Sequence, residues 1–282
     1  MLGKLIRHDI KSIWKLLCII YGAIIFTTII GFVTVQTLHL DFIRQNYFLA
    51  LFSKLFIFTY VILVISGGIV TMTYLIVHFY RNMYGDEGYL MHTLPVKSSS
   101  LITSKLINSV IWTVICTIVI LFSTFTLSFA NSKHAFSDIS DAFSEFSTIY
   151  SKTASILNTN TFVLTLAIIF VLILSMCTAY LKFYFVISIG QLWSGHKLLG
   201  SVLTYIGLSI VTRIINSILT FTLMQGNFSI INNTDLEFTN SSSSVSSLWL
   251  SCYLPLVLLS LIYCIIFYIV TTLIMKKHLN LE

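Results

Sequence analysis

The sequence predicts an all-α integral membrane protein with six transmembrane helices. Of its 282 residues, 57% are hydrophobic and only 9% are charged, whereas about 25% of the residues in a soluble domain are charged. A helix needs about 20 apolar residues to cross a bilayer. Six stretches meet this requirement: 16–35, 55–77, 106–129, 162–181, 201–223 and 248–275. We therefore expect a single transmembrane domain over residues 1–282.

Residues 1–15 have the pattern of an amphipathic helix that lies in the membrane interface. Lys4, Arg7, Lys11 and Lys15 recur every three or four residues, and apolar residues fill the opposite face. Such a helix would place its cations against anionic headgroups, with Trp14 at the water boundary. A basic flank that only orients the first span is the alternative. The first span is longer than the apolar core of a signal peptide and ends without a small-residue cleavage pattern, so we expect it to be retained.

The basic residues of the loops indicate an orientation. Under the positive-inside rule, the side with more Lys and Arg is cytoplasmic. Eleven lie on the side of the two termini and the second and fourth loops, and four lie on the other side. The eleven are Lys4, Arg7, Lys11, Lys15, Arg81, Lys97, Lys105, Lys182, Lys197, Lys276 and Lys277; the four are Arg44, Lys54, Lys133 and Lys152. We expect a multi-pass protein of the cell membrane with both termini in the cytoplasm, and this topology explains the net charge of +6 without a nucleic-acid partner.

Two longer segments fall on the outer side. In residues 130–158, apolar side chains repeat at intervals of three and four and predict an extracytoplasmic amphipathic helix: Phe136, Ile139, Phe143, Phe146 and Tyr150. A lid on the bundle or the outer leaflet is the simpler interpretation, and a helix that binds a specific partner is the alternative. The other segment, residues 225–247, is rich in Asn, Ser and Gly, which is typical of a loop.

The chain carries no recognisable catalytic motif. It lacks the phosphate-binding G-x-x-x-x-G-K-[ST] loop, the zinc-binding H-E-x-x-H pattern and the G-x-S-x-G nucleophile turn. All five cysteines lie inside apolar spans without metal-ligand spacing, so we interpret them as small buried hydrophobes. We therefore expect a protein that is not an enzyme and that binds neither a metal nor a cofactor.

The loop at residues 78–105 has the composition of a structured docking element. Gly85 and Gly88 permit a tight turn, and Asp86 and Glu87 add charge near a helix start. Pro95 ends a hydrophobic patch that consists of Tyr89, Leu90, Met91 and Leu94. Because an exposed apolar patch at a polar surface usually marks a contact, we expect this loop to bind a partner protein. An amphipathic turn that rests on the membrane is the alternative.

Three segments resemble the permease subunits of type-2 ATP-binding-cassette (ABC) exporters, especially those of Gram-positive bacteria. They are MLGKLIRHDIK at residues 1–11, YGDEGYLMHTLPVKSSSLITSK at 84–105 and YFVISIGQLWSGHKLLGSV at 184–202. With the six-span plan, the resemblance covers essentially the whole chain. It implies a dimer with an identical or homologous permease that forms the translocation path. It also implies two separate ATPase subunits that bind ATP and Mg, and efflux of amphipathic or antimicrobial peptides or hydrophobic drugs.

The resemblance also implies roles for particular residues. The coupling helix that the family presents to its ATPase would be formed or flanked by Asp86, Glu87, Gly88, Tyr89, Leu90, Thr93, Leu94 and Pro95. The loop at residues 190–200 would supply a secondary contact, through Gln191, Trp193, His196 and Lys197. The re-entrant outer helices of the family would fall in residues 225–247, which are more polar here than the family pattern.

One charge lies deep within a predicted span. Arg213 is about twelve residues into the fifth span, hence roughly 18 Å along the helix axis, and Asn216 shares its helical face. A charge at this depth is costly and usually faces a cavity or an interface. We hypothesise that Arg213 faces the dimer seam in the translocation path and meets an anionic group of substrate or lipid. An arginine that snorkels or bonds helix carbonyls is the alternative.

Two other functions compete with an exporter permease. An ion-coupled secondary transporter predicts inverted repeats with broken spans at matching places, but Gly67 and Gly68 in the second span have no counterpart in the other half. A non-transporting sensor or scaffold would have no use for the loop that begins at Tyr84. The exporter permease is therefore the leading interpretation.

Overall fold

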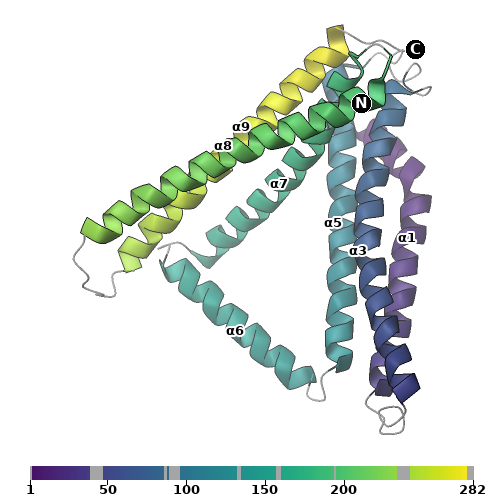
Figure 1. Ribbon diagram of the computed structural model, residues 1–282, viewed down its shortest axis with the longest axis vertical. Coiled ribbons are helices and arrows are strands. Elements are labelled where there is room, and N and C mark those ends of the chain that lie inside the picture. The colour runs from purple at the N-terminus through teal and green to yellow at the C-terminus, as the bar shows by residue number, and fades with distance from the viewer. Residues whose placement is uncertain are drawn as a thin grey trace. The chain divides into compact units, whose positions relative to one another are not determined.

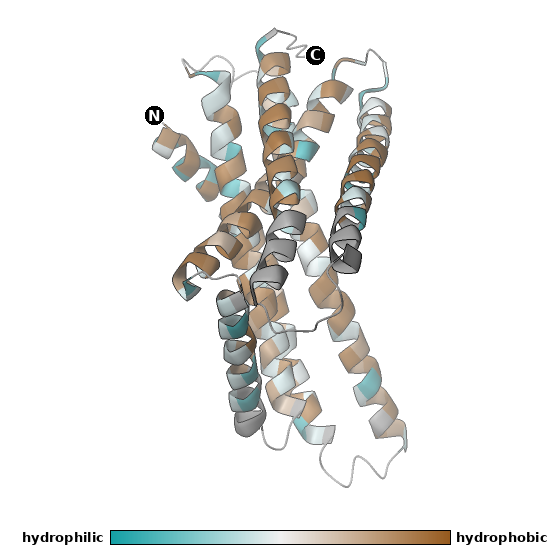
Figure 2. Ribbon diagram, turned by 90° about the vertical axis from the view of Figure 1, so that its left-hand side faces the viewer, coloured by the Kyte–Doolittle hydropathy of each residue, from teal (hydrophilic) through white to brown (hydrophobic). Residues whose placement is uncertain are grey.

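The computed structural model describes residues 2–38, 47–85, 88, 96–131, 135–156, 160–193, 195–233 and 242–277. Its helices are α1 (Leu2–Leu38), α3 (Tyr47–Tyr84), α5 (Ser98–Asn131), α6 (Ala135–Ile156), α7 (Thr161–Gly190), α8 (Lys197–Asn233) and α9 (Ser242–Lys277) (Figure 1). The described residues contain no β-sheet. All of these helices except α6 include a stretch long and apolar enough to cross a membrane, and Figure 2 shows hydrophobic residues along most of their length. By helix length and hydropathy, the chain is a multi-pass membrane protein.

The N-terminal helix differs from the prediction of a separate interfacial helix over residues 1–15. Helix α1 begins at Leu2 and continues without a break to Leu38, because no proline or other helix breaker separates the amphipathic segment from the first span. Ile13 and Leu17, on the apolar face of that segment, are fully buried within the protein. This part of the apolar face therefore packs on protein, while Lys4, Arg7, Lys11 and Lys15 are exposed.

The helix predicted over residues 136–150 is confirmed as α6, which is longer at its C-terminal end. Phe143, Phe146 and Ile149 are exposed on it by 72%, 64% and 58%. The end of α6 is tied to the start of α7: Tyr150 Oη donates to the Thr161 carbonyl at 2.7 Å and lies 2.7 Å from Thr165 Oγ1.

The prediction of a loop over residues 225–247 is wrong for 225–233 and 242–247, which belong to α8 and α9. Intrinsic helix propensity is a weak guide, and its effect is small beside that of the surroundings. Near a membrane, a helix satisfies backbone hydrogen bonds that a loop leaves open, so Asn and Ser residues are accommodated in it. Residues 234–241 lie outside the described part of the chain.

The helices fall into two compact units, Met1–Met83 with His92–Ser144, and Tyr84–Met91 with Glu145–Glu282. In the first unit, α1 packs along α5, and α3 meets both helices through side chains. Thr28 of α1 and Tyr60 of α3 both hydrogen-bond to Ser123 of α5. A Cβ on Gly67 of α3 would lie 2.7 Å from Ile24 of α1, so this glycine permits close contact between the two helices. In the second unit, α7 packs along both α8 and α9.

Candidate docking face and buried charges

The second unit brings together parts of the two loops that were predicted to contact a partner. Tyr84, the last residue of α3, is buried, and its hydroxyl donates to Ser188 Oγ at 2.7 Å. Ser188 lies two residues before the end of α7 and donates to the Tyr184 carbonyl at 2.8 Å. The start of the first loop is thus fixed to the helix that leads into the second loop.

The first loop begins with the tight turn that its glycines permit. The Gly88 backbone N–H donates to the Gly85 carbonyl at 2.8 Å, and Gly88 is buried. The other residues that the resemblance assigns to the coupling helix lie outside the described residues, and their role stays a prediction: Asp86, Glu87, Tyr89, Leu90, Thr93, Leu94 and Pro95. Residues 78–84 and 98–105 of the predicted loop belong to helices α3 and α5.

The second loop is a compact turn between α7 and α8. The Leu192 N–H donates to the Ile189 carbonyl at 2.9 Å, and Gly195 adopts a φ of 104°, which a residue with a side chain rarely tolerates. A Cβ on Gly190 would lie 1.9 Å from Ser201 Oγ and 2.8 Å from the Ser201 backbone nitrogen. The end of α7 and the first turn of α8 therefore meet so closely that only glycine fits.

The surface of this turn is apolar. Leu192, Trp193, Leu198 and Leu199, which we name the α7–α8 patch, are exposed by 47%, 51%, 75% and 58%. Of the four residues predicted to form the secondary contact, Trp193 and His196 are exposed and Lys197 is half-buried, whereas Gln191 is buried. An exposed cluster of large apolar side chains is suited to binding a protein surface or a lipid surface.

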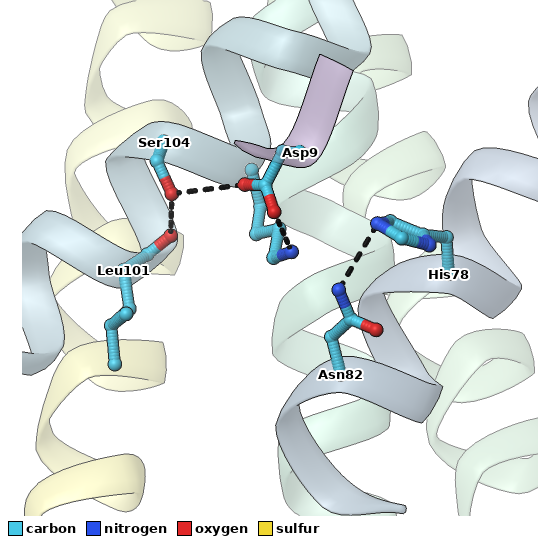
Figure 3. A network of polar contacts seen from close by, with 6 residues as sticks. Asp9, His78, Asn82, Leu101 and Ser104 are labelled. Atoms are coloured by element: carbon cyan, nitrogen blue, oxygen red, sulfur yellow. Dashed lines mark hydrogen bonds and ion pairs between the residues drawn. The ribbon is translucent and has the colours of Figure 1, made fainter. Parts of the chain in front are cut away.

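The first unit contains a buried ion pair that the sequence analysis did not identify (Figure 3). Asp9 of α1 and Lys105 of α5 are 2.5 Å apart, with side chains only 2% and 3% exposed. Ser104 Oγ lies 3.4 Å from the second carboxylate oxygen of Asp9. The pair fixes the first turns of α1 to the first turns of α5, the helix that follows the predicted docking loop. The sequence offers no direct signal for this pair, because Asp9 precedes the first predicted span, which begins at residue 16, and only the longer helix α1 includes it.

On α3, a polar contact lies beside this pair. Asn82 Nδ2 and His78 Nε2 are 3.1 Å apart (Figure 3), and Asn82 is buried. Both residues belong to the last turns of α3 before the loop. Each of the three helices of the first unit thus buries a polar side chain here: Asp9 on α1, Asn82 on α3 and Lys105 on α5.

The two residues proposed to line a translocation path, Arg213 and Asn216, are both exposed on α8. Arg213 forms no ion pair with any residue that the structure describes. Trp14 is 46% exposed on α1, among the basic residues of the first turns. In the same described part of the chain, no three His, Cys, Asp or Glu side chains are grouped as a metal site would require.

Comparisons with family models, with curated proteins and with solved structures gave no match to this chain.

Proposed function

We propose that this six-span membrane protein is the permease subunit of an ATP-driven ABC exporter. Two such subunits, identical or homologous, would form the translocation path, and two separate ATPase subunits would bind ATP and Mg and dock on the cytoplasmic loops. Both termini would then be cytoplasmic, and the cargo would be an amphipathic peptide or a hydrophobic drug. The support from sequence is the resemblance of residues 1–11, 84–105 and 184–202 to that class of permease.

The observation that carries the proposal is the hydrogen bond between Tyr84 and Ser188. A permease that responds to an ATPase needs its docking segments attached to its spans, because a loose loop would absorb the displacement. Here the residue that precedes the 85–97 loop is buried against α7, and the Gly88–Gly85 bond closes a turn immediately after it. Movement of the loop would therefore move α7, which packs along α8 and α9.

The other end of the same loop is also anchored. Helix α5 begins at Ser98, directly after the loop, and Lys105 pairs with Asp9 of α1 two turns later. A push on the loop would thus reach α3 and α7 at one end, and α5 and α1 at the other. Such transmission requires that the contacts differ between two states of the permease, and the polar contacts near the helix ends are the candidates.

The proposal is tested by co-purification with the ATPase subunit that is encoded beside the permease gene. The test variant combines Glu87→Arg and Leu90→Asp in the docking loop. A matched control, Glu145→Arg with Ile149→Asp, makes similar changes on the exposed face of α6, where Ile149 is 58% exposed. We expect the wild type and the control to retain the ATPase and the loop variant to lose it while remaining folded. If the wild type never binds an ATPase, the exporter assignment fails, and an ion-coupled transporter or a scaffold becomes the better interpretation.

A further inference from the structure

Helices α7 and α8 carry two cations within their membrane-spanning parts. Lys182 lies eight residues before the end of α7, and Arg213 lies 16 residues after the start of α8. At 1.5 Å per residue, these positions are about 12 Å and about 24 Å from the respective helix ends. The short turn between Gly190 and Lys197 connects those two ends, so both distances are measured from the same side of the membrane.

Lys182 and Arg213 lie on helices α7 and α8, which pack against each other (Figure 1). The Lys182 Nζ atom lies 5.1 Å from the centre of the Tyr205 ring, which stacks on Phe183 at 5.2 Å. Tyr205, Ser209 and Arg213 follow one another at intervals of four residues, so they share a face of α8. Helical side chains lean toward the N-terminus of their helix. Because α7 and α8 run in opposite directions here, the Lys182 side chain leans toward the depth of Arg213, and the Arg213 side chain leans toward the depth of Lys182.

Nothing in helices α7, α8 and α9 neutralises the two cations. Helices α7, α8 and α9 contain no Asp or Glu, and neither cation forms an ion pair with a described residue. The face of Tyr205 attracts Lys182 but carries no net charge. The Ser209 hydroxyl, which has no hydrogen-bond partner in the described part of the chain, is buried and carries no charge. A charge within the membrane is costly unless it is paired, so we expect an anion to bind these two cations.

A second copy of the chain has no free acidic residue to offer at this depth. Asp9 is the sole acid in the six candidate spans, and it is buried against Lys105. The surface around Arg213 is strongly apolar, because Ile206, Ile210 and Ile214 of α8 are exposed by 49%, 54% and 52%. The missing partner therefore combines an anionic group with a hydrocarbon chain.

We propose that Lys182, Tyr205 and Arg213 form a binding site for the phosphate group of an anionic amphiphile whose acyl chains lie along α8. The phosphate accepts hydrogen bonds from the two cations. The site does not depend on the proposed export function, because a lipid would bind it in the isolated chain, without ATP or an ATPase.

The test uses the purified full-length chain in a neutral detergent, with dioleoyl phosphatidylglycerol, dioleoyl phosphatidylcholine and inorganic phosphate as separate probes. Binding is measured by native mass spectrometry. We expect the phosphatidylglycerol Kd to be at least tenfold lower than that of phosphatidylcholine, and Lys182→Gln combined with Arg213→Gln to raise it at least tenfold. The matched control, Lys54→Gln with Lys152→Gln, removes two exposed charges elsewhere and is expected to change the Kd less than twofold.

Three outcomes would overturn the proposal. The first is equal binding of the two lipids by the wild type, and the second is equal loss of phosphatidylglycerol in the test and control variants. The third is displacement of phosphatidylglycerol by millimolar inorganic phosphate, which would indicate a site for a free anion. If the charge-neutralised variant does not fold, a phosphatidylglycerol with a photoreactive acyl chain is cross-linked to the wild type. Labels concentrated on residues 182–214 support the site, and labels concentrated on other helices refute it.

Discussion

Neutralising one member of the Asp9–Lys105 pair is expected to destabilise the protein strongly. Replacing both members is expected to lower its stability by much less than the sum of the two single losses. The charged atoms are 2.5 Å apart and both side chains are almost completely buried. At an effective dielectric constant of about 20, the attraction at that distance is about 7 kcal/mol. Most of it offsets the desolvation of the two charges, so the net contribution of the intact pair is small.

The cost of a single substitution is larger, because it leaves a buried charge without its partner. Loss of one member of a buried pair typically costs about 3–5 kcal/mol, so Asp9→Asn and Lys105→Met should each lower the unfolding temperature by about 10 °C. The double variant has no unpaired charge. We therefore expect its loss of stability to be less than the sum of the single losses by about 2–3 kcal/mol, near the upper end of measured couplings between contacting residues.

The assay is thermal unfolding in one detergent, followed by intrinsic fluorescence. It compares the wild type, the two single variants and the double variant, with Lys11→Met as a control. Lys11 is an exposed cation two residues after Asp9, and its loss should shift the transition little. If the losses of stability from the Asp9 and Lys105 substitutions are additive to within about 0.5 kcal/mol, the two residues behave as independent sites. The inference that α1 and α5 are joined by this pair would then be wrong.

Two further predictions concern the docking face. Gly190→Ala would place a methyl group 1.9 Å from Ser201 Oγ and should lower the free energy of unfolding by about 1–3 kcal/mol. The control Gly207→Ala, whose methyl group would meet nothing within 4 Å, should be neutral or stabilising. Equal effects of the two substitutions on thermal unfolding would contradict the close contact at Gly190. Tyr84→Phe removes one hydrogen bond, worth about 1 kcal/mol, and leaves Ser188 bonded to a carbonyl. It should therefore keep the fold and ATPase binding but reduce stimulation of ATP hydrolysis several-fold. Unchanged stimulation would show that the Tyr84–Ser188 contact is not needed for coupling.

The six spans could be predicted because the length of an apolar stretch is read directly from the sequence. Their ends could not, because the helices continue beyond the apolar residues. Helix α1 includes the charged residues before position 16, and α8 includes the polar residues 225–233. Hydropathy reports where a chain can enter the bilayer, whereas helical hydrogen bonding continues until a breaker or a competing contact stops it.

The contacts between distant residues at the docking face and at the buried ion pair could not be predicted from the sequence, for a different reason. Asp9 and Lys105 are 96 residues apart, and Tyr84 and Ser188 are 104 residues apart. Local periodicity shows which face of a helix is polar, but it does not show which other helix covers that face. The apolar pattern places Lys182 in a loop, whereas the structure places it inside α7 and over the Tyr205 ring. Arg213 was recognised because depth within a span depends on sequence position alone.

The most direct test of the proposed function is the rate of ATP hydrolysis by an ABC ATPase encoded beside the gene for this chain, measured in lipid vesicles with and without this chain. We expect the wild-type chain to change that rate several-fold and the Glu87→Arg, Leu90→Asp variant to leave it at the level of the ATPase alone, with the α6 control behaving as wild type. A rate that is the same with the wild-type chain, with the loop variant and with no permease would contradict the claim that this membrane protein couples to an ATPase.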